Sequence, residues 1–265
     1  KSTPEAKNEF ITEPNDNLKQ AKRGGTLRLN HFQDVQGLDP GFANVPNETV
    51  KIYAYSWLFA YEAGYKEPSQ NKVIGDIGES WEFSPDGLTL TVKFRQGVKW
   101  HNRPPINGRA MDIEDVVFSY NRLAEKGAPK GDIVNAANPN APVLSFTATD
   151  KNTIVVKLKE PTSYITAIFA YATGVMPMLT KETDSTFDIR GDQTGTGPFM
   201  LDKYAPSVSF SYKRNPDYYN KDVPYADAVD MPIVSEYAAR LSELKAGNIH
   251  ALWGQSRARA EDILV

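Results

Sequence analysis

Alternating apolar and polar residues predict two β-hairpins in this chain. Between residues 88 and 94 every second residue is apolar, and this run follows the turn sequence Ser-Pro-Asp-Gly at 84–87. Proline presets φ in such a turn and glycine accepts its closing geometry. A second alternating pair, 143–149 and 153–159, flanks Asp150-Lys151-Asn152. Each hairpin is therefore expected to turn one face toward a core and the other toward solvent.

Apolar residues spaced three and four apart predict helices. The clearest pattern starts after Asp112, with apolar residues at 113, 116, 117, 120 and 123 and a stop at Gly127. Asp112 is expected to cap this helix, and the acidic residues of its first turn suit the helix dipole. Further helices are predicted at 50–59, at 162–172, and after Ser235 up to Gly247; short strands are predicted at 26–30, 197–204, 208–213, 231–234 and 249–253.

Helices and hairpins follow one another without regular βαβ alternation. This order favours an α+β fold with a mixed sheet over a Rossmann domain. The 265 residues, 40% of them apolar, suffice for one large domain or two smaller ones. The uncharged stretch 162–180 contains Gly174 and Pro177, so a buried helix is a better interpretation than a membrane span.

Composition excludes several classes of function. A net charge of −3 gives no reason to expect nucleic acid or an anionic membrane as partner. The absence of cysteine removes disulfides and thiol chemistry. His31, His101 and His250 show no metal-ligand spacing, and the glycine-rich segment 191–198 lacks the Lys-Ser/Thr ending of a phosphate loop. We therefore expect no metal, no cofactor and no enzymatic activity.

A series of short motifs runs along the chain in a fixed order. They are GGTLRL at 24–29, LDP at 38–40, the stretch 80–101, IEDVVFSY at 113–120, VVKLKEP at 155–161, GTGPF at 195–199, RNPDYY at 214–219 and LKAGNI at 244–249. Together they resemble the peptide-type extracytoplasmic solute-binding proteins of ABC importers, the oligopeptide, dipeptide and nickel-binding family. The chain departs from that family at His250, where an Asp is usual, and by stopping at Val265.

The resemblance implies a periplasmic-binding-protein-like fold of the cluster C type. It implies a flexible lead-in at 1–23, a main lobe from 24–50 and 184–253, and an inserted α/β subdomain at 51–183. Residues 254–265 would begin the hinge, and the second lobe would be missing.

The resemblance also implies a function. It is the capture of an oligopeptide or related small solute by lobe closure, without chemistry on the ligand, and its delivery to a membrane permease. Such a protein is expected to be monomeric and periplasmic or extracellular, anchored as a lipoprotein at full length. Because the second lobe carries many ligand contacts, we expect the chain alone to bind peptide weakly or not at all.

The resemblance nominates two groups of ligand-binding residues. Asp34 is expected to pair with a ligand cation, and Val35 and Gln36 to pair their main chain with an extended ligand. Trp253 and Gln255 lie where the family's chain leaves the first lobe, so Trp253 is expected to form the floor of the ligand cleft. A plain surface loop at 33–36 and a core position for Trp253 are the alternatives. His31 and His250 lie on strands that the family places close together.

Two other functions remain open at this stage. One is a hydrolase on an α+β scaffold that uses a pair of carboxylates. The other is a sensor or interaction module outside transport. Turnover of a peptide or glycoside would favour the first, and the absence of neighbouring permease and ATPase genes would favour the second.

Overall fold

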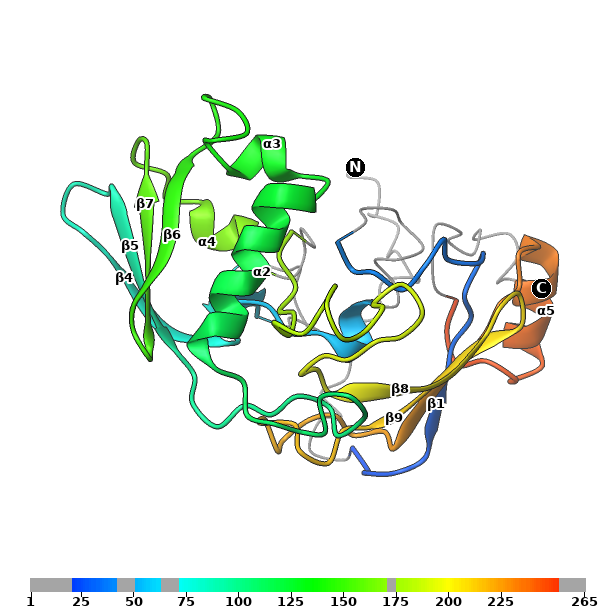
Figure 1. Cartoon of the computed structure of the whole chain (residues 1–265). Helices are drawn as coiled ribbons and strands as arrows, with labels where there is room; N and C mark the ends of the chain where they lie inside the picture. The colour runs from blue at the N-terminus through cyan, green and yellow to red at the C-terminus, as the bar shows by residue number, and fades with distance from the viewer. Residues whose placement is uncertain (1–20, 42–50, 63–71, 171–174, 253–265) are drawn as a thin grey trace, which may run out of the picture.

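A computed structural model describes residues 21–41, 51–62, 72–170 and 175–252. Figure 1 shows two sheet-based bodies side by side, with the chain entering the main sheet at β1 and with α5 as the last element of the described residues. The strands are β1 (Thr26–Arg28), β2 (Phe59–Tyr61), β3 (Val73–Gly75), β4 (Gly78–Phe83), β5 (Thr89–Phe94), β6 (Val143–Asp150), β7 (Thr153–Leu158), β8 (Phe199–Ala205), β9 (Ser209–Arg214) and β10 (Ala228–Pro232). The helices are α2 (Ile113–Lys126), α3 (Lys130–Ile133), α4 (Ile165–Ile168) and α5 (Tyr237–Lys245).

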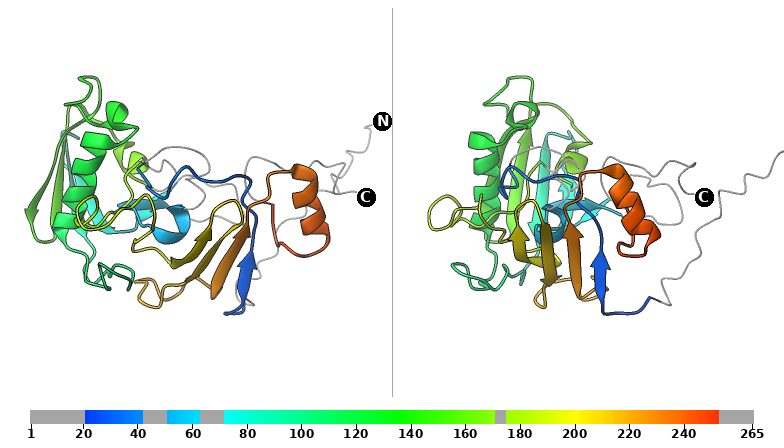
Figure 2. Two further views of the ribbon diagram at one scale, coloured as in Figure 1. Left: turned by 45° about the vertical axis from the view of Figure 1, so that its right-hand side comes forward. Right: turned by 90° about the vertical axis from the view of Figure 1, so that its right-hand side faces the viewer.

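The main sheet is mixed, as the sequence predicted. Its order is β1-β10-β9-β8, in which β1 pairs with β10 in parallel and the other pairs are antiparallel. The second large sheet, β4-β5-β7-β6, is wholly antiparallel, and α2 covers one of its faces (Figure 2). The α+β class with a mixed sheet is therefore confirmed.

The two predicted hairpins and the capped helix are present. β4 pairs with β5, and β6 pairs with β7. Asp112 caps α2 in a capping box, in which its side chain accepts from the Asp115 amide and the Asp115 side chain accepts from the Asp112 amide. Such a reciprocal pair satisfies two amides that the first helical turn leaves without partners.

Two separate clusters of buried side chains form the cores. One lies between the β4–β7 sheet and α2 and includes Leu90, Val92 and Trp100. The other lies on the main sheet and includes Phe210, Tyr212 and Met231. Residues 53–57 and Leu179 pack into the main-sheet core, although the sequence division places them in the inserted subdomain. The subdomain boundaries themselves stay a prediction.

The helix predicted at 50–59 is wrong beyond its first part. Within the described residues, helix covers 51–54, and Phe59 already begins β2. The Trp57 amide donates to the Asp76 carboxylate at 2.8 Å, and the Ile77 amide donates to the Trp57 carbonyl at 2.9 Å. Pairing with the chain around Asp76 therefore replaces helical hydrogen bonds that a local apolar pattern would favour.

Three smaller predictions also differ from the structure. The helix expected at 162–172 shrinks to Ile165–Ile168, because Phe169 and Ala170 pair with Phe59 instead; residues 171–172 lie outside the described part. Glu236 rather than Ser235 is the N-cap of α5, without a side-chain cap. Residues 249–252 form no strand, and Trp253 lies outside the described residues. No helix among the described residues is long and apolar enough to cross a bilayer.

Candidate functional site

The loop after β1 is held at both of its ends. The His31 amide donates to the Pro232 carbonyl at 2.8 Å, and the Val234 amide donates to the His31 carbonyl at 2.8 Å, which continues the β1–β10 pairing past β1. At the other end the Leu38 amide donates to the Arg190 carbonyl at 3.0 Å. The segment 32–37 between these anchors is the candidate ligand loop.

Asp34 lies in this loop and is bound by the β8–β9 hairpin. Its carboxylate accepts from the Tyr204 hydroxyl at 2.5 Å, from the Ser207 amide at 2.7 Å and from the Ser207 hydroxyl at 2.8 Å. Burial alone would raise the pKa of Asp34, but these hydrogen bonds outweigh it and hold the pKa below its usual 3.8. Asp34 is therefore ionised at neutral pH.

Val35 and Gln36 differ in how they face solvent. The Val35 side chain is half-buried and packs against the main-sheet core, whereas Gln36 is exposed. Among the described residues, no backbone partner is found for the amide and carbonyl of Gln36. Trp253 and Gln255, the other two predicted ligand residues, lie outside the described part of the chain.

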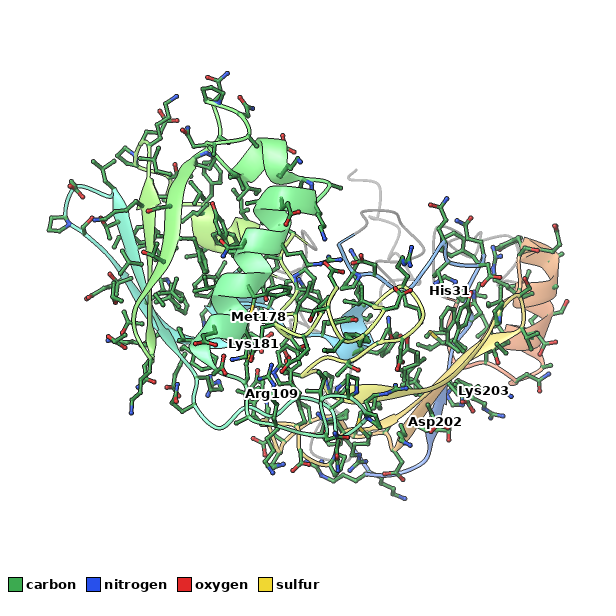
Figure 3. All side chains as sticks on the ribbon, in the orientation of Figure 1. His31, Arg109, Met178, Lys181, Asp202 and Lys203 are labelled. Atoms are coloured by element: carbon green, nitrogen blue, oxygen red, sulfur yellow. The ribbon has the colours of Figure 1, made fainter. Side chains whose placement is uncertain are left out.

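The three histidines contact other parts of the fold. His31 is fully buried, with its ring centroid 5.4 Å from that of Phe32, and it lies beside the main sheet near α5 (Figure 3). Nδ1 of His250 accepts a hydrogen bond from the Arg28 amide at 3.2 Å. Burial lowers the pKa of His101 to about 4, and its ring nitrogens contact Gly195 and Gly197. Within the described ranges no group of three His, Cys, Asp or Glu residues could hold a metal ion.

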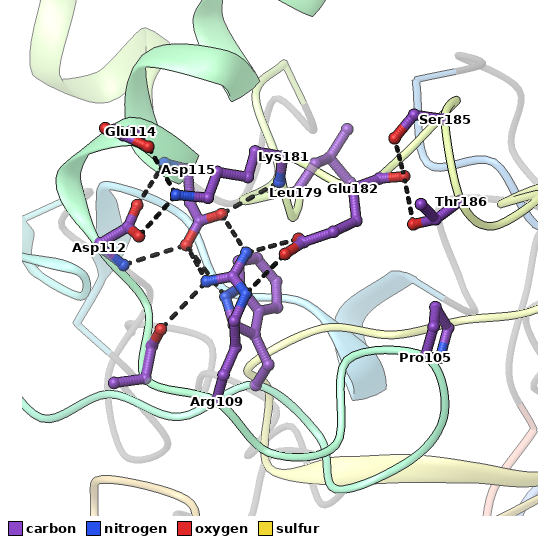
Figure 4. A network of polar contacts seen from close by, with 12 residues as sticks. Pro105, Arg109, Asp112, Glu114, Asp115, Leu179, Lys181, Glu182, Ser185 and Thr186 are labelled. Carbon is purple, nitrogen blue, oxygen red and sulfur yellow. Dashed lines mark hydrogen bonds and ion pairs between the residues drawn. The ribbon is translucent and has the colours of Figure 1, made fainter.

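A partly buried ionic network at the start of α2, centred on the buried Asp115, was missed by the sequence reasoning. Arg109 lies between Asp115 and Glu182, with Nη2–oxygen distances of 2.6 and 2.5 Å (Figure 4). Asp115 is fully buried and also accepts from the Trp100 indole at 3.1 Å and the Lys181 amide at 3.0 Å. The sequence suggested only a first-turn anion, because the partners lie up to 66 positions away. Because the Asp115 carboxylate already accepts these hydrogen bonds, the network serves to hold α2 to the segments that carry Arg109 and Glu182.

A second network joins α2 to the loop that follows the ligand loop. Arg122 binds Asp39 with bonds of 3.1 and 2.7 Å and also pairs with Asp184 at 2.8 Å. An open cavity of about 550 Å³ lies beside it, lined by Asp39, Lys126 and residues 184–188 and 190. The charges of Asp39, Lys126 and Asp184 already meet a partner there, so this cavity is a weaker candidate site than the loop.

Comparison with known proteins identifies the family to which this chain belongs. Residues 72–263 match the profile of the bacterial extracellular solute-binding proteins, family 5 Middle. The di/tripeptide-binding protein 2 of Pseudomonas aeruginosa is 28% identical over 193 residues, which cover 67% of this chain and 36% of that protein. A probable ABC transporter-binding protein of Deinococcus radiodurans is 27% identical over 249 residues, covering 85% of this chain and 40% of that protein. The chain thus spans well under half the length of these relatives.

Solved structures share the fold. The ABC transporter-associated periplasmic binding protein DppA from Helicobacter pylori, in complex with a peptide, aligns with a TM-score of 0.74 at 23% identity over 87% of this chain and 47% of that one. MoaA from A. tumefaciens, in complex with mannopinic acid, aligns with a TM-score of 0.72 at 25% identity over 88% of this chain and 45% of that one. The profile match covers most of the chain, and the chain therefore belongs to the family 5 bacterial extracellular solute-binding proteins.

Proposed function

We propose that this chain is part of the solute-binding component of an ABC importer and that its ligand is a peptide. In the proposed mechanism the main lobe and a second lobe close around the ligand, and burial of the ligand stabilises the closed state. The ligand is released unchanged to the permease. The protein is proposed to act outside the cytoplasm as a monomer anchored by a lipid at full length.

The family match over residues 72–263 carries this proposal. Its relatives are named as binding proteins rather than enzymes, and several of those names specify peptides. One relative of the same fold holds mannopinic acid, so the fold alone does not select peptides. The choice of peptides therefore rests on the names of the relatives and on the loop after β1.

The loop supports peptide binding through its main chain. Gln36 is exposed, and its amide and carbonyl have no backbone partner among the described residues. An extended peptide bound as an added strand satisfies such groups regardless of its own side chains. We assign the ligand contact in this lobe to the main chain of Val35 and Gln36. Trp253 and Gln255 remain proposed contacts from the sequence.

The test is ligand binding by the gene product at its native length, after unfolding and refolding to remove any ligand that copurifies. Dipeptide, tripeptide and longer peptide pools would be compared with opines, sugars and nickel–histidine by thermal shift, and positive pools would be titrated calorimetrically. Saturable binding of peptides is expected. Binding of another solute class alone rejects peptide capture, and turnover of a bound compound rejects a pure binding role.

A matched pair of variants tests the main-chain contact. Gln36→Pro removes the amide donor, whereas Gln36→Ala keeps it and removes only the side chain. Loss of one hydrogen bond is expected to weaken peptide binding by about tenfold in Gln36→Pro, with a change below about twofold in Gln36→Ala. Equal effects of both variants would contradict the main-chain contact.

A further inference from the structure

The Asp34 carboxylate has little bonding capacity left for a ligand. A carboxylate offers about four acceptor positions. Three are taken by the Tyr204 hydroxyl at 2.5 Å and by the Ser207 amide and hydroxyl at 2.7 and 2.8 Å. These three donors leave about one acceptor position on Asp34 for a ligand ammonium group.

Ser207 makes the contact important for the hairpin. It occupies the tip between β8 and β9 with a φ of 58°, in the left-handed region that residues other than glycine seldom adopt. A non-glycine residue persists there only when its surroundings hold it. Both the amide and the hydroxyl of Ser207 donate to Asp34. Asp34 therefore supplies two of the hydrogen bonds that hold this tip conformation, beside the turn bond from the Val208 amide to the Ala205 carbonyl at 3.0 Å.

Tyr204 ties the same contact to the core. Its ring stacks on Phe210 with centroids 4.4 Å apart and planes 6° from parallel. Phe210 is fully buried, and its ring centroid lies 5.5 Å from that of His31 at the base of the loop. The position of the Tyr204 hydroxyl is thus set by core packing. The loop is fastened to the hairpin at two points, Tyr204 and Ser207.

The loop consequently turns its side chains inward at the positions where a ligand was expected to meet a charge. Asp34 points to the hairpin, and Val35 packs on the main-sheet core. Gln33 and Gln36 are exposed and uncharged. We infer that Asp34 is a positioning residue that clamps the loop to the β8–β9 tip, so that the loop meets a ligand with neutral main-chain groups and does not select for a ligand cation. This inference rests on the proposed function for its ligand, but the clamp itself can be tested without one.

Hydrogen exchange tests the clamp in the protein at its native length. Exchange would be followed by mass spectrometry in segments 33–38 and 205–209 for the wild type, Asp34→Asn and Tyr204→Phe. Asp202→Asn is the matched control, because Asp202 is an exposed carboxylate of β8 that pairs with Lys213 at 2.8 Å. Faster exchange in both segments, by about tenfold in Asp34→Asn and less in Tyr204→Phe, is expected, with no change in the control. Unchanged exchange of segment 33–38 in Asp34→Asn would overturn the clamp.

Binding of trialanine and N-acetyl-trialanine separates a clamp from a ligand contact. If Asp34 positions the loop, Asp34→Asn weakens both peptides by the same factor, and Tyr204→Phe weakens both in the same ratio. If Asp34 pairs with the ligand amine, Asp34→Asn weakens only trialanine, and the inference fails. If the wild type binds neither these peptides nor the pools tested above, the proposed function fails, while hydrogen exchange still decides on the clamp.

Discussion

Asp76 should make the stability of this protein depend on pH. Its carboxylate lies in the segment between β3 and β4, where it accepts from the Trp57 amide at 2.8 Å and from the Tyr219 hydroxyl at 2.5 Å. Burial raises the pKa of Asp76 from 3.8 to about 6, and these hydrogen bonds and the charge of Arg95 offset the increase only in part. The unfolded chain titrates this group near 3.8.

The sign and size of the effect follow from these two values. Between pH 6 and pH 4 the folded protein binds a proton that the unfolded chain does not, so its stability falls as pH rises through this window. Raising the pKa of Asp76 from 3.8 to about 6 corresponds to about 3 kcal/mol in the free energy of unfolding. The penalty is fully present above the folded pKa and disappears below the unfolded one.

Urea unfolding of the wild type and Asp76→Asn measures this directly. Tryptophan fluorescence at pH 7.5, 6.5, 5.5 and 4.5 gives the free energy of unfolding of both proteins, and their difference cancels the groups they share. The wild type is expected to gain about 2 kcal/mol relative to Asp76→Asn as pH falls from 7.5 to 4.5, and the full amount of about 3 kcal/mol only below pH 3.8. Tyr219→Phe, which removes a donor to the carboxylate, should move the window to higher pH. A difference that is constant with pH, or that grows as pH rises, refutes the reasoning.

Three further substitutions test packing, capping and the buried network by urea unfolding. Gly195→Ala would place its Cβ 1.9 Å from the Ala54 carbonyl oxygen and should cost about 3 kcal/mol or more, while Gly131→Ala, with nothing within 4 Å, should be nearly neutral. Asp112→Ala removes the N-cap of α2 and should cost about 1 kcal/mol; no loss would argue against the capping box. Asp115→Ala leaves Arg109 and Trp100 without their buried acceptor and should cost about 3 kcal/mol, and a loss below about 1 kcal/mol would show that Glu182 replaces it.

The sequence pattern predicted those elements whose hydrogen bonds join residues close together in the chain. The β4–β5 and β6–β7 hairpins have close turns between partners, and the N-terminus of α2 is set by Asp112 and Asp115, three residues apart. The end of α5 was also visible, because Gly247 has a φ of 73° that suits glycine after a helix. In each case the residues that decide the structure are neighbours in the chain.

Elements that depend on distant partners were predicted poorly. Phe59 leaves the expected helix to pair with Gly75 in β2–β3 and to bridge to Ala170, far along the chain. Ile165–Ile168 stops as a single short helix for the same reason, because the Phe169 carbonyl accepts a hydrogen bond from the Phe59 amide at 3.4 Å. A stretch of about ten residues does not show which distant residues will pair with it. Tertiary pairing can therefore override the structure that the local apolar pattern predicts.

The candidate site shows the same division. The resemblance nominated Asp34, Val35 and Gln36 as ligand contacts, and that role stays a prediction. The partners of Asp34 lie 170 and 173 positions away, and neither was visible as a signal in the sequence. From the sequence, a polar residue such as Ser207 at a hairpin tip predicts only a turn.

The attachment of α2 to both cores limits how this architecture can be reused. Its Val116 and Leu123 pack into the core of the β4–β7 sheet, while its Arg122 is bonded to Asp39, which follows the ligand loop. Excising the body built on the β4–β7 sheet for transplantation would leave two carboxylates, Asp39 and Asp184, without their guanidinium counter-ion. The excised body would carry the arginine, without its carboxylates, into its new host. Modular exchange between relatives must therefore move these three residues as a set.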